Sequence, residues 1–257
     1  MIMIDKLAYS SNLRYKNPCL KAFVAISTLL ICVGFPSIYI SLLTILLMGS
    51  LTVFFGKTSL KYYLHLMIIP LGFLALSTIA IVVNISDKPL SIFSISLLGY
   101  YITVSTSSFF YGINLVMTAL GAVSCLYFLS LSTPIIDILY VLEVVHCPSL
   151  IIELLLLIYR FIFILLDVSN NIYISQKCRL GNKDFKTSLN SSSKLVSVML
   201  IRALKKSSLL YDAMESRCYD GKIHVLKEHT DSSKAEIIAA IILEIILLII
   251  GIVCWRV

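Results

Sequence analysis

The chain has 257 residues, of which 59% are hydrophobic and 14% are charged, with a formal net charge of +7 and a mean hydropathy of +0.96. Ordinary soluble domains are about 45–50% apolar and about 25% charged. Folding in water alone cannot bury this much apolar surface, so the composition excludes an ordinary soluble domain and predicts an integral membrane protein.

Long apolar runs predict the membrane-spanning helices. Each is close to the roughly 20 residues that cross a bilayer. The polar segment NISDKPLSIF, after the third run, is predicted to be a loop. No small-residue cleavage site follows the first run, so we expect no secretory signal peptide. The predicted spans are 20–35, 38–55, 62–84, 107–131 and, near the end of the chain, 236–255.

The fold prediction is therefore an all-α membrane protein in three parts. Residues 1–134 form a bundle of about four spans, 135–235 form a charged helical module, and 236–257 form a last spanning helix. Lysine and arginine gather in the first 21 residues, at 56–61 and in the helical module, which places these parts in the cytoplasm.

The segment 149–169 is apolar enough to be a further span, but it carries charge. Glu153, Arg160 and Asp167 recur every seven residues and therefore share one helix face. A lone span facing lipid would not carry such a stripe. We therefore predict a helix at the cytoplasmic membrane surface, whose apolar side needs cover from other helices or from a partner.

Two helices of the module end in an arginine close to a glycine. The first ends at Arg179, before Gly181, and the second, about 189–219, contains Arg217, before Gly221. Glycine is a common helix stop because it accepts left-handed backbone angles. An apolar stripe is predicted on the second helix, made of Val196, Met199, Ala203, Leu210 and Met214.

Two interpretations of these arginines are open. A cation in the last turn of a helix complements the helix dipole by about 0.3–1 kcal/mol and needs no function. Alternatively, an arginine on a rigid helix end can enter a groove of a cytoplasmic partner and bind a carboxylate through two hydrogen bonds.

The remaining chemistry-bearing residues do not indicate an enzyme. No phosphate-binding loop, zinc-protease motif or nucleophile elbow occurs. The cysteines are odd in number, lack Cys-x-x-Cys pairs and have no zinc spacing with the histidines, so we expect most to be small apolar residues. They are Cys19, Cys32, Cys125, Cys147, Cys178, Cys218 and Cys254.

Glu244, the pair Glu143 and His146, and the basic region 160–235 each allow more than one interpretation. Glu244 lies inside the last span, where it either marks a cation path or is protonated or paired, for example with Asn114. Glu143 and His146 are predicted to make a local contact rather than a ligand pair. The basic region 160–235 also holds seven acids, which favours a membrane face or a protein surface over nucleic acid.

Several segments together resemble the transmembrane T component of energy-coupling factor transporters, in its cobalt branch, CbiQ. IDKLAYSSNLR is similar to the start of that family, and LGYYITVS and GAVSCLYFLSLSTPIIDIL to its fourth-helix region. IIELLLLIYRFIFILLD, SQKCRLGNKDFKTSL and LYDAMESRCYDGK resemble the following helix and the two coupling helices. The resemblance covers nearly the whole chain.

The resemblance implies a non-catalytic subunit of a multi-pass prokaryotic cell-membrane importer for cobalt. Two CbiO-like ATPase subunits would bind ATP and Mg and hydrolyse the ATP, so this chain would bind no cofactor. Its coupling helices would pass their movement to a CbiM-like substrate-binding subunit, with or without a CbiN-like one. A nickel or vitamin importer is the first alternative, and a membrane enzyme using Glu244 and the 149–169 stripe is the second.

The resemblance also implies the residues that contact the ATPase. The family carries Ala-Arg-Gly-type motifs at its two helix ends. This chain keeps each arginine but replaces the small neighbours. The two tips implied are Cys178-Arg179-Leu180 and Ser216-Arg217-Cys218.

Overall fold

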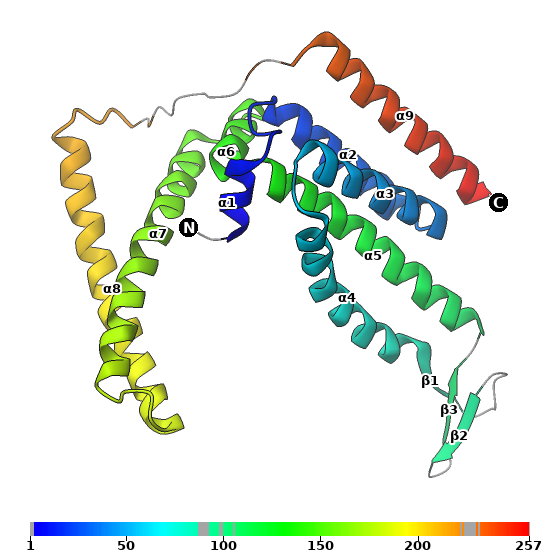
Figure 1. Cartoon of the computed structure of the whole chain (residues 1–257), viewed down its shortest axis with the longest axis horizontal. Coiled ribbons are helices and arrows are strands. Elements are labelled where there is room, and N and C mark those ends of the chain that lie inside the picture. Colours follow the sequence, from blue (N-terminus) through cyan, green and yellow to red (C-terminus); the bar gives the residue numbers. More distant parts are fainter. Residues whose placement is uncertain are drawn as a thin grey trace. The chain divides into compact units, whose positions relative to one another are not determined.

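The computed structural model describes residues 3–86, 93–97, 100–104, 106–221, 223, 230 and 232–256, and it is mainly helical (Figure 1). The chain divides into two compact units, 142–227 and 2–141 with 228–257. The helices are α1 (Met3–Ser10), α2 (Pro18–Gly34), α3 (Ile38–Ser50, continued by a π-helical turn, Leu51–Phe55), α4 (Leu60–Val82), α5 (Thr106–Ser132), α6 (Ile135–Val144), α7 (Ser149–Cys178), α8 (Phe185–Glu215) and α9 (Lys234–Arg256).

The predicted spans coincide with α2, α3 with its π-helical turn, α4, α5 and α9, and their ends agree within two residues. This confirms the prediction of a helical integral membrane protein. The division at residues 134 and 235 stays a prediction.

The sequence predicted a loop between α4 and α5. The structure corrects this prediction, because it forms three short strands in that connection. They are β1 (Val83–Ser86), β2 (Phe93–Leu97) and β3 (Tyr100–Val104). β3 lies between the other two and pairs antiparallel with both. β-Branched and aromatic residues dominate β3, and such residues favour strands.

Five described helices are long and apolar enough to cross a membrane, but they are not the predicted five. Ser149–Cys178 is among them, whereas Pro18–Gly34 is apolar but has only 17 residues. Seventeen residues are at the lower end of the range of about 17–25 that spans a bilayer. The surface location predicted for 149–169 stays a prediction, because its length and apolarity also suit a span.

α5 is the centre of the membrane unit, residues 2–141 with 228–257, since α2, α3 and α4 all pack against it. The helices approach closely at Gly121. A Cβ atom there would lie 2.7 Å from the Cys32 sulfur of α2 and 2.8 Å from the Thr44 hydroxyl of α3. Small residues allow membrane helices this proximity, which provides the van der Waals contact that holds them together. The core beside it contains Val24, Ala25, Met48, Cys125 and Phe128.

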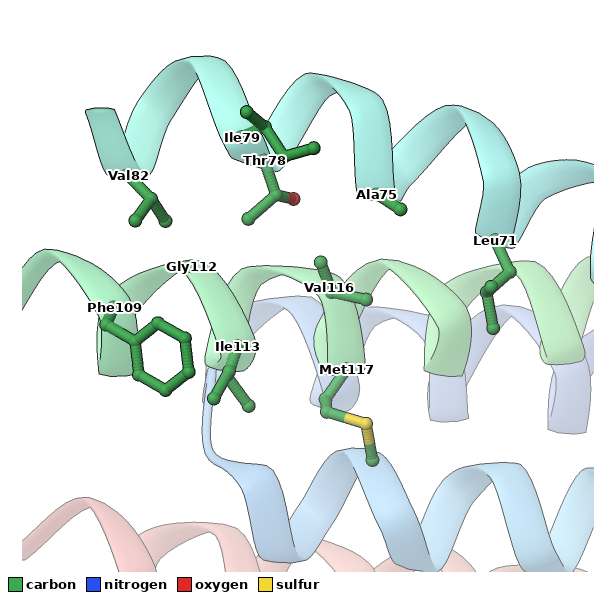
Figure 2. Close-up of a pocket in the computed structure, with 10 residues that line it drawn as sticks. All are labelled: Leu71, Ala75, Thr78, Ile79, Val82, Phe109, Gly112, Ile113, Val116 and Met117. Carbon is green, nitrogen blue, oxygen red and sulfur yellow. The ribbon is translucent and has the colours of Figure 1, made fainter. Parts of the chain in front are cut away.

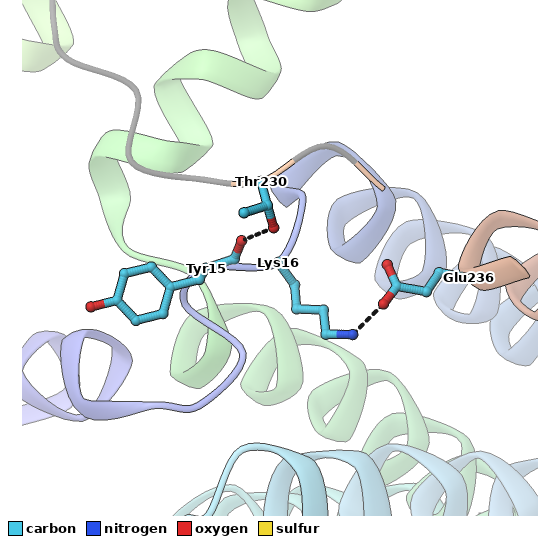
Figure 3. Close-up of polar contacts among 4 residues, drawn as sticks. All are labelled: Tyr15, Lys16, Thr230 and Glu236. Carbon is cyan, nitrogen blue, oxygen red and sulfur yellow. Dashed lines mark hydrogen bonds and ion pairs between the residues drawn. The ribbon is translucent and has the colours of Figure 1, made fainter. Parts of the chain in front are cut away.

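The segment before α2 connects several parts of this unit. The buried Lys21 amino group donates to the carbonyl oxygens of Leu13 and Ser132, both at 3.0 Å. Figure 3 shows a second connection, in which the Tyr15 carbonyl accepts hydrogen bonds from Thr230, and Lys16 forms an ion pair with Glu236 of α9. These bonds anchor the start of α9 to the N-terminal segment.

Two glycines provide a matched test of this packing. Gly121→Ala should lower the free energy of unfolding by about 1–3 kcal/mol, because the added methyl group overfills a tight contact. Gly72→Ala, in α4, should be neutral or stabilising by about 0.5–1 kcal/mol, because no atom lies within 4 Å of the new Cβ. Unfolding of both variants in the same detergent measures the difference, and equal stabilities would contradict the packing described.

Candidate functional site

The candidate site is the hairpin of α7 and α8, which lies within the unit 142–227. The short turn 179–184 joins the two helices, and hydrogen bonds connect them at both ends, so they run antiparallel. Near the turn, the Gln176 side-chain amide donates to the Ser191 carbonyl oxygen at 2.9 Å. At the other end, the Tyr219 hydroxyl donates to the Glu153 carboxylate.

The first tip is the end of α7. The Leu180 N–H donates to the Lys177 carbonyl oxygen at 3.1 Å, and the Gly181 N–H donates to the Gln176 carbonyl oxygen at 2.8 Å. Leu180 itself is left-handed, with φ of 58°. This pair of bonds is a Schellman motif, which satisfies carbonyl groups that the helix end would otherwise leave without partners.

The second tip, at the end of α8, has the same backbone pattern. The Cys218 N–H donates to the Glu215 carbonyl oxygen at 3.0 Å, and the Tyr219 N–H donates to the Met214 carbonyl oxygen at 3.1 Å. Cys218 is left-handed, again with φ of 58°. Arg179 and Arg217 therefore occupy equivalent positions, each directly before the left-handed residue.

The predicted glycine stops are wrong in position. The left-handed residues are Leu180 and Cys218, whereas Gly181 has no positive φ and the left-handed Gly221 lies three residues after Cys218. Gly181 is needed for space, because a Cβ atom there would lie 2.9 Å from both the Gln176 carbonyl oxygen and the Ser191 hydroxyl.

Both arginines are available to a partner. Arg179 and Arg217 are exposed, and neither pairs with an acid in the part of the chain that the structure describes. Their neighbours Cys178, Leu180, Ser216 and Cys218 are exposed as well. The six residues implied as partner contacts thus form two accessible tips.

The burial of side chains in the hairpin differs from the predicted stripes at one position of α8 and along the charged stripe of α7. Val196 of α8 is 65% exposed, and Leu195 takes its place on the half-buried face with Met199 and Ala203. On α7, Glu153 is half-buried against Tyr219, whereas Arg160 and Asp167 are exposed. The seven-residue spacing gave the shared face, but it did not indicate that only Glu153 meets the end of α8.

The sequence matches the family described as the cobalt transport protein CbiQ over residues 10–228. The chain belongs to this family. It is 32% identical to an uncharacterized protein of Methanocaldococcus jannaschii, over 97% of this chain and 92% of the relative. It is 25% identical to the cobalt transport protein CbiQ of Salmonella typhimurium, over 88% of this chain and the full length of that protein.

A third relative is larger than this chain. It is the putative fused cobalt transport protein CbiMQ of Methanocorpusculum labreanum, which is 29% identical over 98% of this chain but only 42% of its own length. The family and the apolar helices together establish a multi-pass membrane protein of a transport family.

The other charged side chains that the structure describes are not assembled into a metal site. Among the described residues, no group of three or more His, Cys, Asp and Glu side chains could hold a metal ion. The backbone N–H of His146 donates to the backbone carbonyl oxygen of Glu143 at 3.0 Å and helps to end α6, whereas a contact between the two side chains stays a prediction. The thiols of Cys32 and Cys125 are buried between membrane helices.

Glu244 does not pair with Asn114, which is one of the pairings that we expected from the sequence. The Asn114 amide donates to the Pro36 carbonyl oxygen at 2.7 Å. Glu244 is 8% exposed in α9, and neither of its oxygens has a hydrogen-bond partner among the described residues. Such burial costs stability unless the acid is neutral or another subunit supplies a donor.

The chain also has an apolar groove between α4 and α5, with a volume of about 440 Å³ (Figure 2). Leu71, Thr78 and Ile79 line it from α4, and Phe109, Ile113 and Met117 line it from α5. The groove has almost no polar surface. It therefore suits hydrocarbon and offers no ligands for a metal ion.

The Tyr219–Glu153 bond should hold the second tip in place. The Glu153 carboxylate, as the acceptor, raises the pKa of Tyr219 above its ordinary value of 10.0, so the hydroxyl remains a donor at neutral pH. Tyr219→Phe should increase hydrogen exchange at the Cys218 and Tyr219 amides several-fold, because local opening no longer breaks this bond. Tyr211→Phe, at an exposed position of α8, is the control and should change nothing there.

Proposed function

We propose that the chain is the energy-transmitting membrane subunit of a prokaryotic cobalt importer of the energy-coupling factor type. The observation that carries the proposal is the pair of equivalent tips. Arg179 at the end of α7 and Arg217 at the end of α8 are exposed, have no acidic partner among the described residues, and each precede a left-handed residue. One such arginine would be explained by the helix dipole. α6 ends in the same backbone pattern around His146 without an arginine, so it is the two exposed arginines, and not the pattern alone, that favour two similar docking grooves.

The length of α8 sets the separation of those grooves. Its 31 residues rise about 1.5 Å each, so the two tips are about 45 Å apart. A rigid lever of this length can contact two cytoplasmic ATPase subunits at once and move with them when ATP closes the pair. An arginine can bind a carboxylate in each groove through two hydrogen bonds.

The apolar surface of the hairpin supports a further membrane partner. Neither α7 nor α8 has a fully buried residue, and large apolar side chains such as Leu154, Ile158 and Leu204 are more than half exposed. Exposed apolar surface of this extent marks an interaction site. The name of the fused relative supports a CbiM-like substrate-binding subunit as the partner, in the cell membrane.

The docking role of the arginines can be tested with the intact complex. The chain is co-expressed with the ATPase subunits of its importer, as wild type and as the double variant Arg179→Ala/Arg217→Ala. The double variant should release the ATPase during purification or lose coupled ATP turnover and cobalt uptake. The loss should be at least about tenfold, because a charge-assisted two-pronged bond contributes about 1.5–3 kcal/mol.

Arg202→Ala is the matched control, since Arg202 is exposed in the middle of α8. It should retain the ATPase and its coupled turnover. If the double variant behaves like this control, the two arginines only cap their helices and the docking proposal is wrong.

The cargo is the second part of the proposal. The family is one of cobalt transport, and nickel or a vitamin is the alternative cargo. Uptake of labelled cobalt by cells that carry the whole importer, with nickel as competitor, distinguishes the metals. Preferential block by nickel at equal concentration would favour a nickel importer.

Substitution of Glu244 distinguishes an energy-transmitting subunit from a chain that conducts the ion or catalyses a reaction itself. Glu244→Leu should keep cobalt uptake and increase the free energy of unfolding by about 1–3 kcal/mol, because it removes a buried group without partners. Uptake assays and unfolding in detergent measure both effects. Loss of uptake in Glu244→Leu and also in Glu244→Gln would instead indicate a cation path through α9.

A further inference from the structure

We infer that Leu180 is the apolar anchor of the first tip and makes the two tips unequal in their binding to the ATPase. The inference rests on the proposed function. It adds that the groove receiving the first tip has an apolar wall beside the carboxylate that binds Arg179. Cys218 occupies the same position in the second tip and presents a smaller side chain.

The backbone at Leu180 is the first observation. Its φ of 58° is in the left-handed region, where a residue with a Cβ atom is disfavoured and glycine is not. A bulky residue in this region is an outlier. Outliers of this kind gather at functional sites, where the side chain is needed despite the strain.

The exposure of the side chain is the second observation. Leu180 is 70% exposed, so it stabilises the isolated chain little by burial. A leucine that strains the backbone and buries little surface contributes nothing visible to this chain alone. A contact with a partner would explain why a leucine stands here, and the partner proposed for Arg179 is the one beside it.

The hydrogen bonds around Leu180 are the third observation. Its N–H donates to the Lys177 carbonyl oxygen at 3.1 Å, and its own carbonyl oxygen accepts from the Lys183 N–H at 3.2 Å. Ser191 adds a hydrogen bond to the Gly181 carbonyl oxygen at 2.8 Å. The backbone on both sides of the leucine is therefore fixed before binding, which reduces the entropy lost on docking.

The chemistry of the partner follows from the two adjacent side chains. Arg179 requires a carboxylate, and Leu180 requires an apolar surface next to it. Burying a leucine contributes enough to change affinity by about tenfold or more. The first tip should thus bind the ATPase more tightly than the second, where a thiol replaces the isobutyl group.

The experiment measures the affinity of the full-length chain in lipid nanodiscs for the purified ATPase. Leu180→Gly and Leu180→Asn should weaken binding by about tenfold, while Leu180→Met should stay near wild type. Glycine and asparagine both accept the left-handed conformation, so thermal unfolding of these variants should occur at or above the wild-type temperature. Cys218→Leu should strengthen binding.

Leu200→Asn is the control, because Leu200 is a similarly exposed leucine in the middle of α8, far from both tips, and it should bind the ATPase as wild type does. Wild-type affinity of Leu180→Gly would overturn the inference, and so would equal weakening by the control. If Arg179→Ala/Arg217→Ala also binds the ATPase with wild-type affinity, the proposed docking function is wrong as well. If only the arginine variant loses the ATPase, the docking role remains and the role of Leu180 is wrong.

Discussion

The backbone hydrogen bonds that end α7 and α8 are the interaction on which the candidate site depends. In each helix, one N–H group reaches back five residues and another reaches back three, around a left-handed residue. This closes the helix directly after the arginine, so Arg179 and Arg217 sit at rigid, exposed ends. A helix one turn longer would carry its arginine on its side. Everything proposed for docking follows from where these two helices stop.

The hairpin and the membrane unit differ in how their helices are packed. In the membrane unit, Gly121 lets three helices meet closely, and the hydroxyl and thiol groups near it find partners within the bundle, such as Thr44 with Cys32 at 3.5 Å. In the hairpin, two helices alone cannot enclose a core, and no residue of either helix is fully buried. The bundle is thus packed internally, whereas the hairpin presents surface for other subunits or for the membrane.

The two connections of the N-terminal segment bear on how movement could pass along the chain. Tyr15 and Lys16 anchor Thr230 and Glu236 at the start of α9, shortly after the second tip in sequence. Lys21 anchors the same segment to the end of α5. The start of α9 is therefore bonded to the N-terminal segment of its own unit.

The sequence by itself determined the membrane class, the bounds of the five apolar helices predicted as spans to within two residues, and the two arginines near helix ends. Hydrophobic length fixes a membrane helix because the bilayer has a set thickness, and the resemblance located Arg179 and Arg217. The structure showed which residue turns left-handed, since the glycine rule pointed to Gly181 whereas the local hydrogen bonds that end α7 place Leu180 in that conformation. It also gave Glu153 a partner in Tyr219, 66 residues away in the chain. Periodicity reports only neighbours on one helix, and such long-range contacts depend on how the helices pack.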